Sequence, residues 1–272
     1  MKKIRHFIGT FSSVMGMVAC GSGGKPAESN LKLTNAIPAE DTEFPAVVLL
    51  YHPDASNPTY CTATFINDHQ AITAAHCLGS SADGQGDMYL VRPQVDAQGQ
   101  RSFEVKARAV RTHIHPEYDL SQRNAITATD LAIIDFPGGT APASFKLGEE
   151  SPQLNEKVTL VGFGGQESGE KGIQGARTVG DKRYGSNTVK SCTQGLLTLS
   201  GLPRTRESFP VGQHVASAQG DSGSPWLVNG QLASVTIGGE VKQMAQGQEI
   251  GLTYAVDLNS ESSRSFLSSV ID

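Results

Sequence analysis

The strongest constraint on the fold is a succession of short β-prone segments that are separated by turn residues. Valine, isoleucine, threonine and aromatic residues recur in short runs, and glycine, proline, asparagine and aspartate stand between these runs. Few stretches show the 3.6-residue period of an amphipathic helix. This pattern predicts an all-β sandwich or barrel. The expected strands include 46–51, 61–66, 70–73, 89–91, 103–110, 157–164, 226–228 and 231–235.

Two segments near the C-terminus carry more specific local signals. Asn229-Gly230, between two apolar runs, predicts a tight β-hairpin turn. Residues 259–271 predict a C-terminal helix, with Asn259 or Ser260 as its N-cap. The apolar face of that helix comprises Phe266, Leu267, Val270 and Ile271.

Length and charge exclude some classes of function. The chain has 272 residues and a formal net charge of −5. This length allows a sizeable core, and all-β folds of this size often form one unit. The mild acidity argues against nucleic acid as a main partner. The sequence has no nucleotide-binding loop and no convincing metal-ligand cluster, so we expect no cofactor, no metal site and a monomeric protein.

The N-terminus has the pattern of a targeting segment. Residues 1–20 combine a positive start, a short apolar stretch and small residues before Cys20. The stretch is too short to span a membrane as a helix. Its end resembles a bacterial lipoprotein signal, in which Cys20 is lipidated and becomes the mature N-terminus; a plain signal peptide is the alternative. Residues 21–32 are then a flexible tether or propeptide, and 33–272 form the folded domain.

Three short blocks carry the residues needed for nucleophilic catalysis. Residues 219–225 place Ser222 between glycines, on a turn whose backbone N–H groups would face a developing oxyanion. His76 follows two alanines, and Asp130 heads an apolar run. A serine hydroxyl needs an adjacent base, and the order His, Asp, Ser is one of the known orders of a catalytic triad.

These blocks resemble the signature blocks of the trypsin-like (chymotrypsin-fold) serine peptidases, here as a bacterial lipoprotein-type member. The likeness runs from about Leu33 to the C-terminus, and three blocks in order are far more specific than one. The resemblance implies two six-stranded antiparallel β-barrels, followed by the C-terminal helix, with the active site in the crevice between the barrels. It also implies protein or peptide substrates.

The resemblance assigns a role to each residue of the site. His76 is the general base, Asp130 orients its ring, and Ser222 is the nucleophile. The N–H groups of Gly220 and Ser222 form the oxyanion hole. Asp119 also precedes a leucine, but no apolar strand follows it, which favours Asp130. The other histidines lack the small-residue context and are interpreted as surface or core residues.

The cysteines are interpreted separately. Cys61 and Cys77 bracket a short stretch beside His76, and we expect them to form a disulfide, which requires an oxidising compartment. Metal ligation is the rival interpretation, but no second Cys/His pair has suitable spacing. Cys192 then has no partner, and we expect a buried thiol there.

The resemblance also predicts activation by cleavage. Cleavage after Lys32 would free the α-amino group of Leu33, which would pair with Asp221. The alternative is that the chain is never cut and that Asp221 finds another partner, because a buried carboxylate needs a positive group or several donors.

Alignment on Ser222 gives the expected substrate pocket. Ala216 occupies its bottom, where family members that cleave after arginine or lysine have aspartate, so a basic preference is not expected. Thr236 and Gly238 belong to the strand that pairs with substrate backbone, and Gly238 with Gly251 would leave the pocket open. The expected preference is an apolar side chain, although an acidic preference stays open because His214 lies near this wall.

The sequence as a whole predicts a serine endopeptidase that is lipid-anchored at the outer membrane or cell surface, or secreted after cleavage. A catalytically silent binding protein of the same fold is the alternative. An esterase of the α/β-hydrolase type is excluded by the order of the blocks and by Ser224, which stands where Gly-x-Ser-x-Gly requires glycine.

Overall fold

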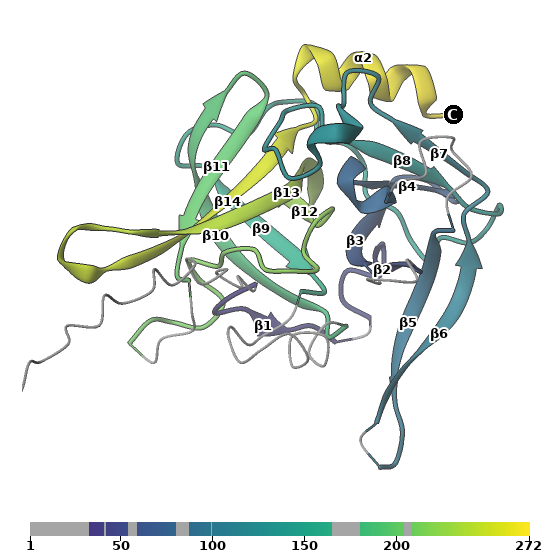
Figure 1. Ribbon diagram of the computed structural model, residues 1–272, viewed down its shortest axis with the longest axis horizontal. Helices are drawn as coiled ribbons and strands as arrows, with labels where there is room; N and C mark the ends of the chain where they lie inside the picture. The colour runs from purple at the N-terminus through teal and green to yellow at the C-terminus, as the bar shows by residue number, and fades with distance from the viewer. Residues whose placement is uncertain are drawn as a thin grey trace, which may run out of the picture.

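The computed structural model describes residues 33–40, 42–53, 59–79, 87–98, 100–164, 180–203 and 208–272. The chain is almost entirely β, and its strands form two sheets that lie side by side (Figure 1). The predicted targeting segment, the lipidation residue Cys20, the tether and Lys32 lie outside the described residues.

The first sheet is formed by the N-terminal half of the chain. Its strands are β2 (Val47–His52), β3 (Thr59–Phe65), β4 (Gln70–Thr73), β5 (Tyr89–Val95), β6 (Arg101–Arg108), β7 (Arg111–Ile114) and β8 (Ala132–Asp135). Their order is β6-β5-β2-β3-β4-β8-β7, and every described pair is antiparallel.

Two residues, Ala109 and Val110, join the opposite edges of the first sheet. The Ala109 N–H donates to the carbonyl of Met88, next to β5, and the Val110 N–H donates to the carbonyl of Asp135, in β8. The chain thus passes from one edge strand to the other as a single bent segment, which curls the sheet into a barrel.

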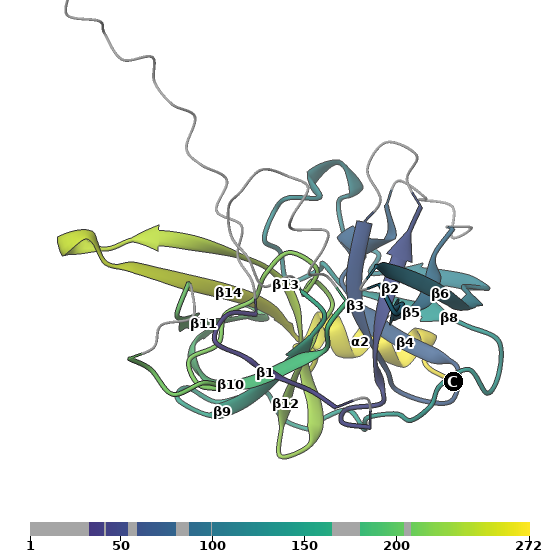
Figure 2. The same ribbon diagram turned by 90° about the horizontal axis from the view of Figure 1, so that it is seen from below.

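The second sheet is a closed barrel. Its strands are β9 (Lys157–Gly162), β10 (Arg183–Thr193), β11 (Leu196–Gly201), β12 (Pro225–Val228), β13 (Gln231–Gln243) and β14 (Glu249–Asp257). The order is β10-β11-β14-β13-β12-β9, and β9 also pairs with β10, which closes the ring. The two-residue strand β1 (Ile37–Pro38) is added at the outside of β10 (Figure 2).

The predicted fold class is therefore confirmed: the chain is all-β, with two barrels and a C-terminal helix. Each sheet has seven assigned strands where six were expected. In the first sheet, the extra strand arises because the bend at 109–110 divides one segment into β6 and β7. In the second sheet, the extra strand is the short β1.

The apolar runs of the sequence fill the two barrels. Strand β2 is buried from Val47 to Leu50, and β4 is buried throughout. Trp226, which is fully buried, lies in the core cluster of the second barrel. Burial of this apolar surface is the main driving force for folding.

The predicted C-terminal helix is α2 (Glu261–Val270). The Ser260 hydroxyl accepts a hydrogen bond from the Ser263 N–H, so Ser260 is the N-cap. Phe266 and Leu267 are buried in the larger core cluster, which combines residues of the first barrel with several of the second. The short 3₁₀ helices are η1 (Ala75–Leu78), η2 (Leu120–Gln122) and η3 (Ala245–Gly247). Within the described ranges, no helix is long and apolar enough to cross a membrane.

Each end of the described chain packs against the barrel that the other half of the sequence forms. Near the N-terminus, the Thr34 N–H donates to the Ala216 carbonyl at 2.9 Å, and the Gly212 N–H donates to the Asn35 carbonyl at 2.6 Å. The C-terminal helix, by contrast, packs on the first barrel, where the Gln70 amide donates to the Val270 carbonyl. Both ends of the described chain therefore link the two barrels to each other.

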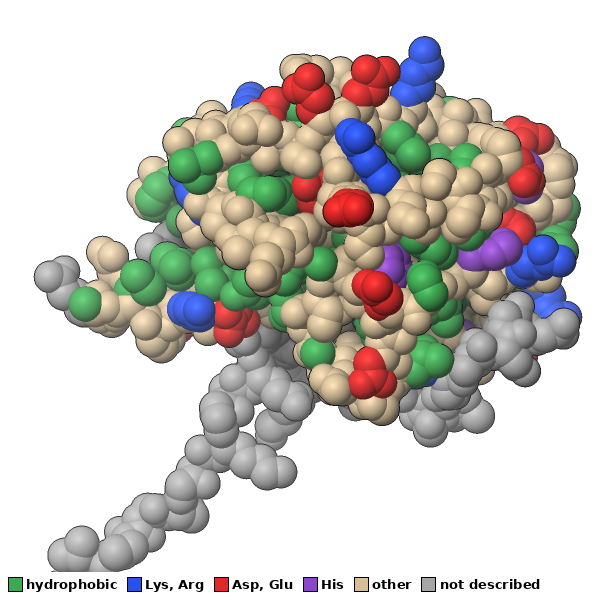
Figure 3. Space-filling view, turned by 90° about the horizontal axis from the view of Figure 1, so that it is seen from above, with side chains coloured by type: hydrophobic (Ala, Val, Ile, Leu, Met, Phe, Trp, Pro, Cys, Tyr) green, Lys and Arg blue, Asp and Glu red, His purple; other side chains and the backbone are tan. Residues whose placement is uncertain are grey.

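Two long hairpins project from the barrels. The β5–β6 hairpin leaves the first barrel at the bottom of Figure 1, and the β13–β14 hairpin leaves the second barrel at the left. Figure 3 shows the β13–β14 hairpin as an arm on the left of the molecule, with hydrophobic side chains along it.

Candidate active site

Strand pairing in the first barrel brings His76 next to Asp130. Strand β4 ends at Thr73, which pairs with Ala132 at the start of β8. Because the strands are antiparallel, the residues that follow β4 and those that precede β8 meet at the same edge of the sheet. His76 lies in η1, directly after β4, and Asp130 lies directly before β8.

Two hydrogen bonds join this pair. The His76 backbone N–H donates to Asp130 Oδ1 at 2.9 Å, and His76 Nδ1 lies 2.7 Å from Asp130 Oδ2. A carboxylate only accepts hydrogen bonds, so Nδ1 is the donor, and in the neutral form of the ring the lone pair is on Nε2. Asp130 is buried, whereas the His76 side chain remains 20% exposed. The ring is thus fixed on one side and open to a reactant on the other.

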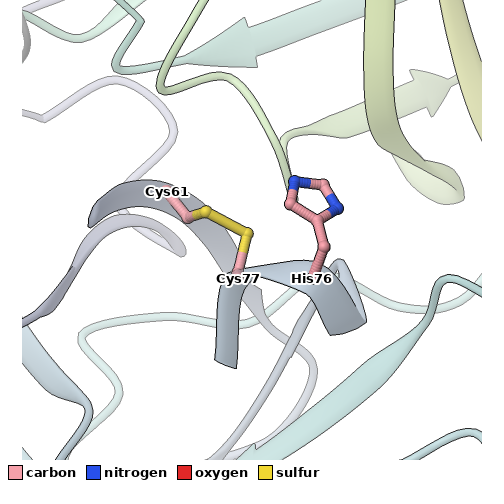
Figure 4. A group of neighbouring side chains, drawn as sticks. All are labelled: Cys61, His76 and Cys77. Carbon is pink, nitrogen blue, oxygen red and sulfur yellow. A yellow bond between two sulfur atoms is a disulfide. The ribbon is translucent and has the colours of Figure 1, made fainter. Parts of the chain in front are cut away.

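A disulfide anchors the turn that carries His76. Cys61 and Cys77 are bonded, with their Cα atoms 6.1 Å apart, so the prediction is confirmed. Figure 4 shows His76 and Cys77 leaving the same turn, with Cys61 approaching from β3. Ligand atoms of Cys61, His76 and Cys77 lie within 4.8 Å of one another. Because both sulfur atoms are in the disulfide, they are not thiolate ligands for a metal.

The prediction for Cys192 was wrong. Its side chain is exposed near the end of β10, where the strand extends beyond the core. Partial burial and the charge of Asp257 raise the pKa of the Cys192 thiol.

Ser222 lies on a turn of the second barrel that is bonded to the first barrel. The Thr62 N–H donates to the Ser222 carbonyl at 2.7 Å, and Thr62 Oγ1 donates to the Gly220 carbonyl at 3.0 Å. Gly223 has φ +83°, and a β-carbon there would overlap the Thr62 carbonyl and the hydroxyl of Thr73. Only glycine allows this close approach. Thr62 was not singled out from the sequence; its position next to Cys61 was the available signal.

The backbone around Ser222 leaves two donors unused. The N–H groups of Gly220 and Ser222 make no hydrogen bond to any residue that the structure describes, whereas those of Asp221 and Gly223 are bonded to carbonyls. Both residues lie within the described ranges, and the Ser222 hydroxyl makes no hydrogen bond with the His76 ring there. Such bonds are often long in ligand-free enzymes and shorten when substrate binds.

Asp221 is fully buried directly before the nucleophile. Its carboxylate accepts hydrogen bonds at 2.8 Å from the N–H groups of Gly164 and Ala218, and a further one from the backbone of Leu33. Burial is the largest effect on this group, and it raises the pKa of Asp221 to about 7 despite the three donors. The structure therefore brings the two residues of the predicted activation pair together.

The predicted substrate-pocket residues lie on neighbouring segments of the second barrel. Ala216 and Thr236 are fully buried. Ser217 Oγ donates to the Gly238 carbonyl at 3.4 Å, which links the segment of Ala216 to β13. Gly251 pairs with Val241, whereas Gly238 pairs with Tyr254, so these two glycines are not direct partners.

This architecture defines a class of protein. Two antiparallel barrels, one holding a His–Asp pair and the other a serine turn, form the chymotrypsin-type double barrel. The solved structure of neuropsin, a serine protease expressed in the limbic system of mouse brain, has the same fold, with a TM-score of 0.59 and 16% identity. The similarity covers 87% of this chain and 99% of neuropsin.

Sequence comparison then gives the family. The family model described as Trypsin matches residues 34–260, and the chain belongs to that family. It is 24% identical to a trypsin of Saccharopolyspora erythraea over 73% of this chain and 82% of that protein. It is 26% identical to a trypsin of Phaedon cochleariae over 65% of this chain and 67% of that protein. The chain is thus a serine endopeptidase, and the prediction of a trypsin-like serine peptidase is confirmed.

Proposed function

We propose that this protein hydrolyses peptide bonds through a Ser222–His76–Asp130 triad and an acyl-enzyme. His76 Nε2 takes the proton of the Ser222 hydroxyl as Ser222 Oγ attacks the scissile carbonyl carbon. The same nitrogen then gives the proton to the leaving amine, and the C–N bond breaks. In the second half of the cycle, water replaces the amine and releases the acyl group from Ser222.

The observation that carries this proposal is the His76–Asp130 pair, with Nδ1 as donor at 2.7 Å. It leaves His76 in the tautomer that a general base requires, and the buried carboxylate stabilises the charged ring once it has formed. The two unused N–H groups of Gly220 and Ser222 support an oxyanion hole at this turn. Removal of one such donor typically costs about 3 kcal/mol of transition-state stabilisation.

The proposal includes activation by cleavage after Lys32. The hydrogen bond from the Leu33 backbone to buried Asp221 supports it, because a free α-ammonium group at the same nitrogen would neutralise the carboxylate. Glycine at 162 and 164 leaves room for the Asp221 carboxyl group, since a β-carbon at either position would overlap it.

The proposed specificity is for side chains other than arginine and lysine. Ala216, at the proposed bottom of the pocket, offers no charge, and the next residue, Ser217, donates a hydrogen bond to the Gly238 carbonyl. The proposed location is outside the cytoplasm, with Cys20 lipidated or with the domain released by cleavage at Lys32. The disulfide between Cys61 and Cys77 supports an oxidising compartment.

The test is intact-mass analysis before and after treatment with a fluorophosphonate. We expect one adduct on the wild-type protein and none on Ser222→Ala. The starting mass also reports whether the chain begins at Leu33. Wild-type protein that begins at Leu33 and still forms no adduct would refute the enzymatic mechanism and favour the silent binding protein.

A further inference from the structure

We propose that the unpaired edge of β13 beyond Gly238, residues 239–243, binds the N-terminal part of an extended peptide substrate as an added antiparallel strand. This inference rests on the proposed function, because it concerns the substrate of the same site. It extends recognition well beyond the few residues next to the scissile bond. The substrate class is therefore long, unfolded polypeptide segments.

Only the first part of β13 has neighbours on both sides. Strand β12 pairs with β13 as far as Val235, and Thr236 exchanges backbone hydrogen bonds with Gly223 and Ser224 of the serine turn. Beyond Gly238, the described residues pair with β13 on one side alone, through β14. Its other edge presents unpaired N–H and C=O groups, which are a template for another strand.

The hydrogen-bond pattern identifies the groups at the free edge. The Leu258 N–H donates to the Ala233 carbonyl, and the Met244 N–H donates to the Gln248 carbonyl. Even-numbered residues along β14 therefore point toward β13. A register shift between Thr236 and Gly238 then pairs Glu240 with Leu252 and Lys242 with Ile250. Because backbone direction alternates, Gly239, Val241 and Gln243 point away from β14.

This free edge is continuous with the catalytic serine. Thr236 points both of its backbone groups at the serine turn, away from β14. Residues 239, 241 and 243 point to that same side. A peptide that is held at Ser222 and runs antiparallel to β13 would therefore meet these groups in succession, every second residue.

The hairpin is braced before any peptide binds. The Tyr254 hydroxyl donates to Glu240 Oε1 at 2.6 Å, and Lys242 Nζ lies 3.3 Å from the same oxygen. Near the tip, Gln243 Nε2 donates to Glu249 Oε1 at 2.6 Å. A preformed strand loses little freedom when a peptide is added, which favours binding.

The first test measures binding and hydrolysis of a peptide series with one scissile bond and two to eight residues on its N-terminal side. Fluorescence anisotropy with Ser222→Ala gives affinity, and wild-type protein gives kcat/KM. We expect both to rise about fivefold for each added backbone hydrogen bond, and to continue rising beyond four residues. A plateau at four residues in both measurements would overturn the proposal.

An N-methyl scan of the longest peptide tests the pairing directly. Each N-methyl group removes one N–H donor. Beyond the fourth residue, we expect losses of about fivefold that recur at every second position, with little change between them. Equal effects at all positions would overturn pairing along β13.

Two variants at position 241 test whether the gain from long peptides comes from the hairpin. Val241→Pro removes an outward N–H without touching a bond to β14, whereas Val241→Ala keeps that N–H. We expect Val241→Pro to lose part of the gain from long peptides, and Val241→Ala to keep it. The rate of fluorophosphonate labelling should be unchanged in both variants, since that reagent does not reach the hairpin.

The outcomes separate failure of this inference from failure of the proposed function. Wild-type protein that labels and cleaves short peptides but gains nothing from length refutes the inference alone. Absence of both labelling and cleavage in protein that begins at Leu33 refutes the proposed function, and the anisotropy series still decides whether the edge binds peptide. A concentration-dependent dimer that Val241→Pro abolishes would assign the edge to a second copy of this chain and refute the inference.

Discussion

The buried carboxyl group of Asp221 makes the uncut and the cut chain respond to pH in opposite directions. In a chain that retains residues 21–32, Leu33 supplies an uncharged backbone N–H, and the pKa of Asp221 is raised to about 7. In a chain that begins at Leu33, the same nitrogen is an α-ammonium group. The opposite charge at this position lowers the pKa of Asp221 below its ordinary value.

The sign follows from proton binding. In the uncut chain, the folded state holds the Asp221 proton between about pH 4 and 7, whereas the unfolded chain has lost it, so the free energy of unfolding falls as pH rises. A shift from 3.8 to about 7 corresponds to roughly 4 kcal/mol over that window. In the cut chain, the folded state binds fewer protons, so the stability from this pair is present above about pH 4 and is lost on further acidification.

The measurement is urea unfolding at several pH values between about 3 and 7.5, which covers both expected changes, with both chain forms carrying Ser222→Ala to prevent autolysis. Trp226 is the single tryptophan of the sequence and is fully buried, so its fluorescence reports loss of the second barrel. Adding Asp221→Asn to each form is the control, and it should remove the difference between the two pH profiles. Parallel profiles in the two forms before that substitution would refute the proposed pairing of Leu33 with Asp221.

Three further predictions concern the site. Gly223→Ala should lower kcat/KM and should lower the free energy of unfolding by more than about 2 kcal/mol, because its β-carbon would overlap the backbone of β3. The control is Gly230→Ala, which is also at positive φ but has open space around it, and it should cost about 1 kcal/mol. Equal losses of the two variants in urea unfolding would contradict this. Replacing both Cys61 and Cys77 by alanine should lower the free energy of unfolding by about 3 kcal/mol, and an unchanged urea midpoint would exclude a stabilising disulfide. Ala216→Asp should raise kcat/KM for arginine substrates about 10- to 100-fold relative to leucine substrates, and no change in that ratio would remove this residue from the pocket.

The catalytic blocks could be found from the sequence because their surroundings are as distinctive as the residues themselves. His76 follows two alanines that are fully buried, and Asp130 precedes a fully buried apolar run. Small and apolar neighbours are what a turn pressed against a barrel requires. The Cys61–Cys77 pair was predictable for the same reason, since both residues flank that turn.

Other features depend on partners that local sequence does not name. Residues 238–243 combine glycines with charged and polar side chains, a composition typical of loops, yet they continue β13 because β14 pairs with them. Strand β1 contains a proline and forms only against β10. Cys192 was expected in the core from its residue type, but β10 extends beyond the core before that residue.

The crossing of the two chain ends has a consequence for biogenesis. Helix α2 packs on the first barrel, and its Phe266 and Leu267 lie in the core cluster that the two barrels share, so these contacts form only after residues 261–270 have been synthesised. The second barrel holds Thr34 and Asn35, which are synthesised long before it exists. Both halves of the site are therefore supported by residues that are distant from them in the sequence, so we expect them to become fully stable only together.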